Sequence, residues 1–325
     1  MRLIAPTLIF FLSLLLLASS PATAQRPDFP SRPIRLLVGF PAGGAGDSLG
    51  RVIGERLANN LGQPVVVDNR AGAGGKIAAE LLAQSLPDGH TLMLTSAAPI
   101  IVAPALGQKL NFDPHTLTPI AKLTDSMVVL LANPSLKLGS VKDLIALAKA
   151  KPRSLTYASP GIGTLPHLSG ELLKSTAGID IVHVPYKGTS AIMPAQISGE
   201  VMLSLVPLGA AMTQIRSGRL QPLAVTGRSR SAALLDVPTL AESGLSGFNV
   251  SLWYGLFAPG KTNQEVVKKI NQQITNIINL QEVKDRLLNL ALEPSASTPG
   301  ELAQLVRSEE KLWAKVIKEA NIKID

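Results

Sequence analysis

GFPAGGAGDSLGR, residues 39–51, is a glycine-rich turn between two segments of different periodicity. The residues before it, RPIRLLV at 32–38, are predicted to form a buried strand. The residues after it, SLGRVIGERLANNLG at 48–62, have helical spacing and predict a helix that ends near Leu61. Strand, tight turn and helix are the parts of an α/β unit, and this unit indicates the fold class of the whole chain.

The turn is suited to hold an anion. It would leave backbone amides free at a helix N-terminus, where the helix dipole also favours negative charge. Gly43, Gly44 and Gly46 would let a ligand approach the backbone closely, and Asp47 is placed to N-cap the helix. The alternative is a plain capped turn without a ligand.

A dinucleotide fits the turn poorly. Gly44, Gly46 and Gly50 form G-x-G-x-x-x-G, one residue longer than the Rossmann pattern. The later AGAGGK at 71–76 fails as a phosphate loop, because Arg70 and Ile77 stand where that motif needs Gly and Ser or Thr. We therefore expect no cofactor.

Strand-like and helix-like segments alternate in two blocks, residues 32–97 and 140–227, separated by the long apolar stretch 117–134. This rhythm predicts a mostly parallel sheet with helices on its faces. Two extended crossings, near 126–131 and 250–257, would divide the chain into two lobes with a cleft; two independent domains in series are the alternative. We expect lobe 1 to comprise 25–126 and 251–325, and lobe 2 to comprise 127–250.

Long amphipathic helices are predicted at 263–291 and 298–320, and these are expected to pack back on lobe 1. In the second of them, six apolar residues near helical spacing predict a core face: Leu302, Leu305, Val306, Leu312, Trp313 and Val316.

The first 24 residues have the features of a secretory signal peptide. Arg2 precedes an apolar core shorter than a membrane-spanning helix, and Ala22 and Ala24 fit a cleavage site after Ala24. A membrane anchor is the alternative. We expect an exported, periplasmic protein whose 325-residue chain, having no Cys, is stabilised without disulfides.

The formal net charge of +8 is spread along the chain without a basic run or interleaved aromatics. This excludes a typical nucleic-acid binder but suits small anionic ligands. No two His share a metal-ligand spacing, so no metal site is expected.

A second glycine loop, YASPGIGTLPHLSGELL at 157–173, has the same strand–turn–helix order. The amides of Gly161, Gly163 and Thr164 could face an anion, and His167 lies in the first turn of the helix. One such loop per lobe, each at the carboxyl end of a strand, would face across a cleft, where open α/β sheets bind ligands.

Nine motifs then follow in order along the chain: RPIRLLVGFPAGGAGD, LGQPVVVDNRAGAGGKIAAE, PDGHTLMLTS, LNFDPHTL, YASPGIGTLPHLSGELL, IVHVPYKGTSA, LAVTGRSR, DVPTLAESG and WYGLFAPG. Together they resemble the Bug family, the extracytoplasmic solute receptors of tripartite tricarboxylate transporters. The resemblance implies a two-lobed α/β fold of the periplasmic-binding-protein kind (type II, Venus flytrap). Such a receptor closes on a small organic carboxylate, as a monomer, and presents it to membrane transporter subunits.

The resemblance also implies a binding site made of the two loops, the TSAA turn and the PYKG segment. The ligand-binding residues carried over are Phe40, Pro41, Ala42, Gly43, Gly44, Ala45, Gly46, Asp47, Ser96, Ala97, Ala98, Gly161, Gly163, Thr164, His167, Tyr186 and Lys187.

Two departures from the family pattern concern the ligand. The chain has Ala-Gly-Gly-Ala-Gly-Asp at 42–47, where the family commonly has Pro-Gly-Gly-Gly-Thr-Asp, so one hydroxyl contact is missing. VPLGAAM at 206–212 replaces a usually polar stretch and would form an apolar wall. The apolar wall favours a ligand less polar than citrate, such as an aromatic or short aliphatic acid.

His167 could donate to a carboxylate or only cap and pack the helix start. His183 is expected to be structural, and His90 and His115 to be surface turn residues. Trp253, with Tyr254 beside it on the second crossing, is expected to pack at the hinge rather than touch ligand.

No catalytic constellation is evident, since the chain lacks a G-x-S-x-G elbow and a Cys nucleophile. We therefore expect a binding protein rather than an enzyme. A receptor that feeds a membrane sensor, and an exported enzyme that uses the same cleft, remain the alternatives.

Overall fold

The computed structural model describes residues 29–322, so the expected signal peptide lies outside the described residues. Ten strands form a sheet in the order β2-β1-β3-β9-β4-β7-β5-β6, with β8 and β10 also paired to β4. The strands are β1 (Ile34–Val38), β2 (Val65–Asn69), β3 (Thr91–Thr95), β4 (Thr118–Ala132), β5 (Thr156–Ser159), β6 (Val182–Pro185), β7 (Leu203–Pro207), β8 (Gln221–Val225), β9 (Ser251–Ala258) and β10 (Glu293–Pro294).

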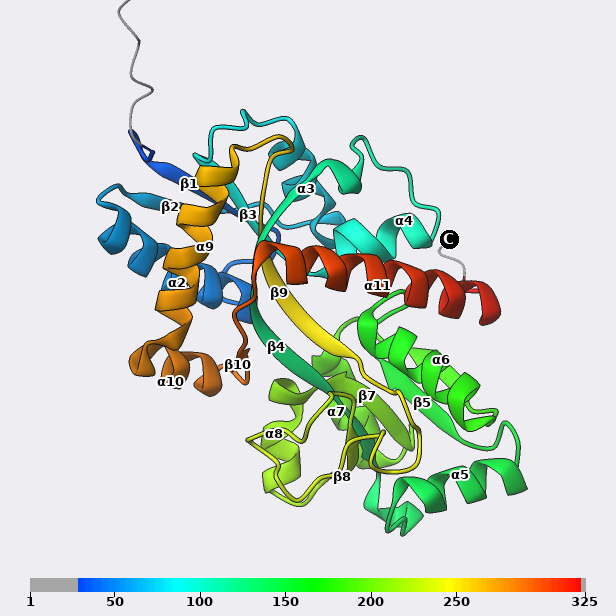
Figure 1. The fold of residues 1–325 in the computed structure, drawn as a ribbon. Helices are drawn as coiled ribbons and strands as arrows, with labels where there is room; N and C mark the ends of the chain where they lie inside the picture. Colours follow the sequence, from blue (N-terminus) through cyan, green and yellow to red (C-terminus); the bar gives the residue numbers. More distant parts are fainter. Residues whose placement is uncertain (1–28, 323–325) are drawn as a thin grey trace, which may run out of the picture.

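Helices cover both halves of this sheet, and the chain is divided into two lobes joined by β4 and β9 (Figure 1). The helices are α2 (Ala45–Leu61), α3 (Lys76–Ala83), α4 (Ala103–Ala105), α5 (Val141–Ala150), α6 (Leu165–Ala177), α7 (Thr189–Ser198), α8 (Leu208–Arg216), α9 (Gln264–Asn279), α10 (Gln281–Asn289) and α11 (Pro299–Glu319). Short helical turns are η1 (Ala73–Gly75), η2 (Ala98–Val102), η3 (Pro114–Thr116) and η4 (Pro134–Leu136).

The expectation of a mostly parallel sheet holds inside each lobe but is wrong for the whole. β1 is parallel to β2 and β3, and β5 is parallel to β6 and β7. β4 is antiparallel to β7, β8, β9 and β10, and β9 is also antiparallel to β3. The reason is topological: β4 leads the chain out of the first lobe and β9 leads it back, so the two run in opposite directions.

The cores form where apolar faces meet. Leu36, Leu37 and Val38 of β1 are fully buried, as expected for a strand covered on both faces. In α9, Val267, Ile270, Ile274 and Ile277 repeat at three- and four-residue intervals and are also fully or almost fully buried.

The predicted helix over 263–291 is two helices rather than one. Leu280 has extended backbone angles (φ −64°, ψ 132°), which end α9 and begin α10. Leu280 is itself exposed, so packing does not hold it within one straight helix. α9 packs against α2.

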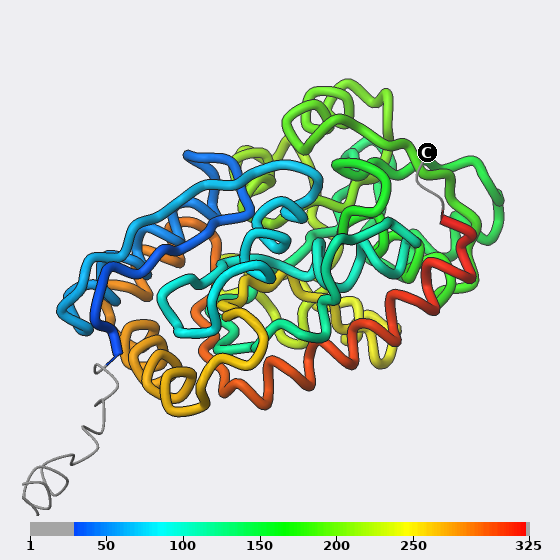
Figure 2. Tube along the Cα trace, turned by 90° about the horizontal axis from the view of Figure 1, so that it is seen from above, coloured from blue at the N-terminus to red at the C-terminus, as the bar shows by residue number. Residues whose placement is uncertain are grey.

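α11 begins with a capping box. The Thr298 hydroxyl accepts from the Glu301 amide, and the Glu301 carboxylate accepts from the Thr298 amide. The six expected core residues of this helix are all buried or partly buried, with Leu302 and Trp313 fully so. Figure 2 shows α11 along one side of the molecule, from α9 to the second lobe, and it contacts both η2 and α6.

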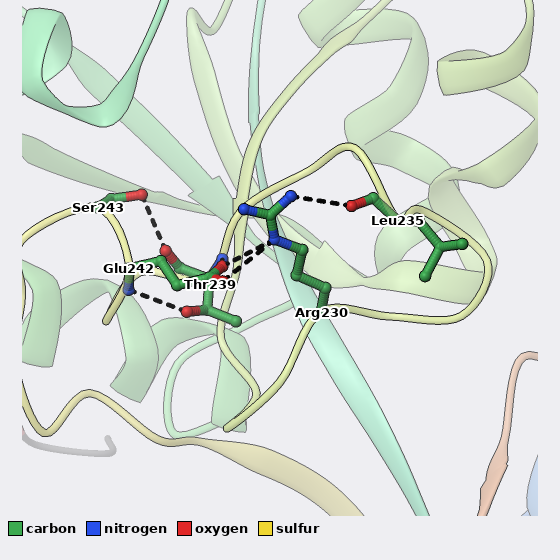
Figure 3. A network of polar contacts seen from close by, with 5 residues as sticks. All are labelled: Arg230, Leu235, Thr239, Glu242 and Ser243. Atoms are coloured by element: carbon green, nitrogen blue, oxygen red, sulfur yellow. Dashed lines mark hydrogen bonds and ion pairs between the residues drawn. The ribbon is translucent and has the colours of Figure 1, made fainter.

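The segment between β8 and β9, residues 226–250, is held by a local polar network (Figure 3). The Arg230 guanidinium donates to the Glu242 carboxylate at 3.0 Å and to the Leu235 carbonyl at 3.1 Å. Thr239 and Glu242 exchange hydrogen bonds of 2.8 and 3.0 Å. This network fixes a long irregular segment beside the crossing strands.

Over residues 29–322, no helix combines the length and the apolar character that a membrane span requires.

Candidate functional site

Five helices begin where a parallel strand ends: α2 and α3 in the first lobe, and α6, α7 and α8 in the second. The first amides of a helix have no partner within the helix, and its N-terminus carries partial positive charge. The carboxyl edges of both parallel sheets are therefore lined by helix N-termini, the place where α/β sheets bind ligands.

The first glycine loop has a different cap from the one expected. Gly44 is the N-cap of α2, and Asp47 lies inside the first turn and reaches back to accept from the Gly43 amide at 2.9 Å. Its other oxygen accepts from Asn69 at 3.0 Å and pairs with Arg51 at 3.1 Å. Burial raises the pKa of Asp47. The hydrogen bonds and the Arg51 charge lower this pKa by a larger amount, so its net shift is downward.

Asp47 therefore stays ionised with its charge balanced inside the loop. Arg51 is exposed and serves as the partner of Asp47.

Gly46 allows the Phe40 ring to lie against the backbone of α2. A Cβ atom at position 46 would be 2.5 Å from Cδ2 of Phe40, which no real contact tolerates. The ring also meets Tyr254 of β9 edge-on, with centroids 5.1 Å apart. The loop is thus tied to one of the crossing strands.

The amides expected to be free in the second loop are already used within it. The Gly161 amide donates to Ser159 Oγ at 3.3 Å, the Gly163 amide to His167 Nδ1 at 3.1 Å, and the Thr164 amide to the Gly161 carbonyl at 3.3 Å. In the described part of the chain, the amides of Leu165 and His167 in the first turn of α6 donate to no other backbone group. The sequence pattern located the helix start but assigned its free donors to the wrong residues.

His167 packs inside the second lobe. Its ring is 5% exposed and stacks on the ring of His183, with centroids 4.0 Å apart. His183 Nε2 lies 2.7 Å from Ser159 Oγ, so the two rings tie the loop to β5 and β6. Burial is the main reason that the pKa of His167 is lowered. Burial also lowers the pKa of His183 to about 3, and the nearby His167 and Lys174 add to this shift.

Both imidazoles are therefore neutral at ordinary pH. Of the two roles considered for His167, its contacts are those of the cap, and His183 makes structural contacts.

The other two histidines differ from each other. His115 is exposed, as expected. His90 is 6% exposed, which contradicts the expectation of a surface turn residue. Its Nε2 accepts from the Ser31 amide at 3.2 Å and its ring meets Phe29 edge-on at 5.1 Å, so the N-terminal segment covers it.

A cavity of about 260 Å³, here called the cleft cavity, is lined by residues of both lobes. Its lining residues are Ser96, Ala97, Ala98, Val102, Pro160, Gly163, Thr164, Leu165, Pro166, Thr189, Pro207, Ser251, Leu252 and Trp253. The N-termini of α6 and α7 both open onto it.

A groove of about 340 Å³, here called the adjoining groove, shares Ala98, Val102, Gly163 and Thr164 with the cleft cavity. Its other lining residues are Ala73, Gly74, Lys76, Ala103, Leu106, Gln108 and Ile162. The two hollows therefore adjoin each other between the lobes.

A third cavity of about 370 Å³, here called the hinge cavity, shares Ser251 and Trp253 with the cleft cavity. Its other lining residues are Lys122, Asp125, Met127, Gly227, Arg228, Ser229, Asn249, Glu293, Leu305, Ser308, Glu309 and Leu312. Trp253 is buried and lines both cavities, and its Nε1 donates to Glu309 of α11 at 3.1 Å.

The model of the tripartite tricarboxylate transporter family receptors, TctC, matches residues 49–322. The chain belongs to the TctC family. BugT of Bordetella pertussis is 35% identical over 305 residues, which cover 93% of this chain and 94% of BugT.

Two solved structures are similar to this TctC-family chain. Rhodopseudomonas palustris Rpa4515 with adipate is 33% identical, with a TM-score of 0.76 and coverage of 91% of this chain and 99% of that one. MatC (Rpa3494) from Rhodopseudomonas palustris with bound malate is 33% identical, with a TM-score of 0.71 and coverage of 89% and 100%. The predicted family and the predicted two-lobed α/β fold are confirmed.

In this TctC receptor, five of the expected site residues line the cleft cavity: Ser96, Ala97, Ala98, Gly163 and Thr164. The others do not line the cleft cavity or the adjoining groove in this structure: Phe40, Pro41, Ala42, Gly43, Gly44, Ala45, Gly46, Asp47, Gly161, His167, Tyr186 and Lys187. The Tyr186 hydroxyl donates instead to Glu200 at 2.8 Å.

Several lining residues of the receptor were not expected at the site: Val102, Pro160, Leu165, Pro166, Thr189, Ser251, Leu252 and Trp253. Trp253 was expected to pack at the hinge in preference to touching ligand. In the structure it lines both the cleft cavity and the hinge cavity, because β9 passes between them. The expected apolar wall at 206–212 is reduced to Pro207. Helix α8, which the sequence reading missed, begins at Leu208 and turns the following residues away.

Within residues 29–322, no group of three or more His, Cys, Asp or Glu side chains is arranged to hold a metal ion.

Proposed function

We propose that this protein is a periplasmic receptor that captures a small organic carboxylate between its lobes and delivers it to a tripartite tricarboxylate-type membrane transporter. The observation that supports this most directly is the cleft cavity, which residues of both lobes line and onto which two helix N-termini open. Relatives with adipate and with malate, at 33% identity, favour a carboxylate as the ligand.

Capture requires closure of the lobes on the ligand. A ligand drives closure only if it binds the closed form better than the open one. We infer that closure brings the first loop, residues 40–47, and the Tyr186–Lys187 segment onto the ligand, which would complete the site expected from the family. The amides at the start of α2, α6 and α7 supply donors from both lobes.

The lobe division at 126/127 and 250/251 belongs to this proposal, and the lobes move about β4 and β9. The proposal also includes cleavage of the signal peptide after Ala24, a monomeric state, and binding without metal or cofactor. The protein acts as a receptor and not as an enzyme on its carboxylate. A membrane sensor in place of the transporter would use the same closed form.

The first test is a thermal-shift titration of residues 25–325 with mono-, di- and tricarboxylates and with the matching amides. The protein is unfolded, dialysed and refolded beforehand to remove any bound ligand, and mass spectrometry of the released fraction identifies what was bound. At 100 times its Kd a ligand stabilises by about 2.7 kcal/mol, a shift of several degrees. A shift with an acid and none with its amide supports the proposal, and no shift with any acid overturns it.

A variant locates the ligand. Thr164 is the N-cap of α6 and lines both the cleft cavity and the adjoining groove, so Thr164→Val is expected to weaken carboxylate binding by about tenfold, the loss of one hydrogen bond to a charged group. Thr176→Val, at an exposed position near the end of α6, is the matched control and should bind as the unmodified protein does. Equal affinities in the two variants would place the ligand elsewhere.

A further inference from the structure

The space between the lobes has an uneven distribution of charge. None of the fourteen residues that line the cleft cavity has an ionisable side chain; nine are apolar and four bear hydroxyls. The adjoining groove has one ionisable side chain, Lys76. In the arrangement of the lobes that the structure describes, the two hollows together therefore present a single cation.

Lys76 is available to a ligand. It is the first residue of α3 and is half-buried. It takes part in no ion pair among the residues that the structure describes. Its ammonium group and the α3 N-terminus both favour an anion at this end of the space.

The opposite end is apolar and firmly built. Leu252 and Trp253 of β9 and Pro207 at the end of β7 line it. The indole of Trp253 is 1% exposed and held by the hydrogen bond to Glu309. An anionic group placed here would lose water and gain no cation from the residues that line the cleft cavity.

We propose that the ligand of this receptor is a monocarboxylate with an apolar body, such as an aromatic ring or a chain of about six carbons. This rests on the proposed carboxylate-binding function and deepens it. The carboxylate lies on the side of Lys76 and Thr164, and the body fills the cleft cavity against Trp253. The volume is sufficient, since a cavity of about 150 Å³ already holds benzene. Adipate and malate, found with the two relatives, are dicarboxylates, so this chain has a different preference.

The test compares hexanoate with adipate, which has the same carbon count and a second carboxylate in place of the methyl end. The chain has two tryptophans, so the Trp313→Phe variant leaves Trp253 as the only indole and its fluorescence reports occupancy of the cleft cavity. Calorimetry on the unmodified protein repeats the comparison without any substitution. Hexanoate and benzoate are expected to bind at least about tenfold more tightly than adipate, and hexanamide to bind far more weakly than hexanoate.

Each result is decisive. Adipate binding as tightly as hexanoate, or more tightly, overturns the monocarboxylate assignment and leaves the receptor function standing. Hexanamide binding as tightly as hexanoate overturns the role of the cationic end. Failure of every acid to bind overturns the proposed function as well.

A charge placed at the apolar end should reverse the preference. Leu252→Arg adds a cation beside Trp253 and is expected to raise the adipate-to-hexanoate affinity ratio by about tenfold or more. Leu86→Arg adds the same charge at a residue that is 70% exposed and lines neither hollow, and should leave the ratio unchanged. An unchanged ratio in a folded Leu252→Arg protein would contradict the assigned orientation.

Discussion

Replacement of Glu309 by Gln should stabilise the protein at alkaline pH and not at acid pH. The Glu309 side chain is 9% exposed, accepts the Trp253 hydrogen bond and lines the hinge cavity with Lys122, Asp125, Arg228 and Glu293. Burial raises its pKa to about 7; Asp125 adds to the rise, while the Trp253 hydrogen bond and Lys122 oppose it.

The direction of this pH dependence is determined by the pKa of Glu309 in the folded and in the unfolded protein. The folded pKa of about 7 lies above the ordinary value of 4.5, so the folded protein holds its proton more tightly. The resulting stability is fully present below about pH 4.5 and is lost as the pH rises to 7. The difference of about 2.5 units corresponds to about 3 kcal/mol of unfolding free energy above pH 7.

The Gln side chain keeps the shape and can still accept from Trp253, but it does not ionise. Melting temperatures are measured from pH 5 to pH 8 for the unmodified protein, for Glu309→Gln and for Glu319→Gln, an exposed control near the end of the same helix. The variant's advantage should be small at pH 5 and reach roughly 5 °C at pH 8. A difference that stays constant with pH, or one that Glu319→Gln reproduces, would refute the reasoning.

Two further predictions concern the second lobe. Burial is the main cause that lowers the pKa of His183 to about 3, so the folded protein keeps this imidazole neutral, and its contribution to stability is present above about pH 6.5 and declines as the pH falls toward 3. Denaturant melts of the unmodified protein should therefore show a loss of unfolding free energy between pH 7 and pH 5, of which His183→Asn should remove about 1 kcal/mol after allowance for partial exposure. The same loss in the variant would contradict this. Gly170→Ala would force a Cβ into the buried Tyr157 ring and should lower the free energy of unfolding in urea melts by about 1–3 kcal/mol. Gly300→Ala, with open space around its Cβ, should leave it almost unchanged. Equal values for the two variants would contradict this and show that α6 shifts to make room for the Cβ.

The sequence predicted strands and helices well where local periodicity decides them. β1 lies within the segment expected for it, and α2 ends at Leu61 as expected although it already begins at Ala45, because apolar spacing and the flanking glycines act locally. The break at Leu280 and the start of α8 at Leu208 have no such local marker: the break is a single extended residue, and α8 follows β7 directly after Pro207. The antiparallel pairing of β4 with β9 joins residues more than a hundred positions apart, which periodicity does not report.

The site was predicted in position but not in detail. The glycine pattern showed where helices start, yet whether the Gly163 amide is free depends on the rotamer of His167, four residues later. The burial of His90 was not predicted because the residues that cover it, Phe29 and Ser31, precede β1 and are distant from His90 in the sequence. The cavity wall of Pro207, Leu252 and Trp253 is assembled from two strands, and only their pairing through β4 brings these residues together.

The paired crossing strands also determine how the lobes can move. β4 and β9 are joined by a ladder from Thr118↔Ala258 to Met127↔Ser251, and β4 continues into the second lobe opposite β7 and β8. Sliding one strand along the other would break that ladder, so the lobes are left with bending and twisting of a two-stranded ribbon. α11 contacts η2 of the first lobe and α6 of the second lobe, so it resists that bending from one side.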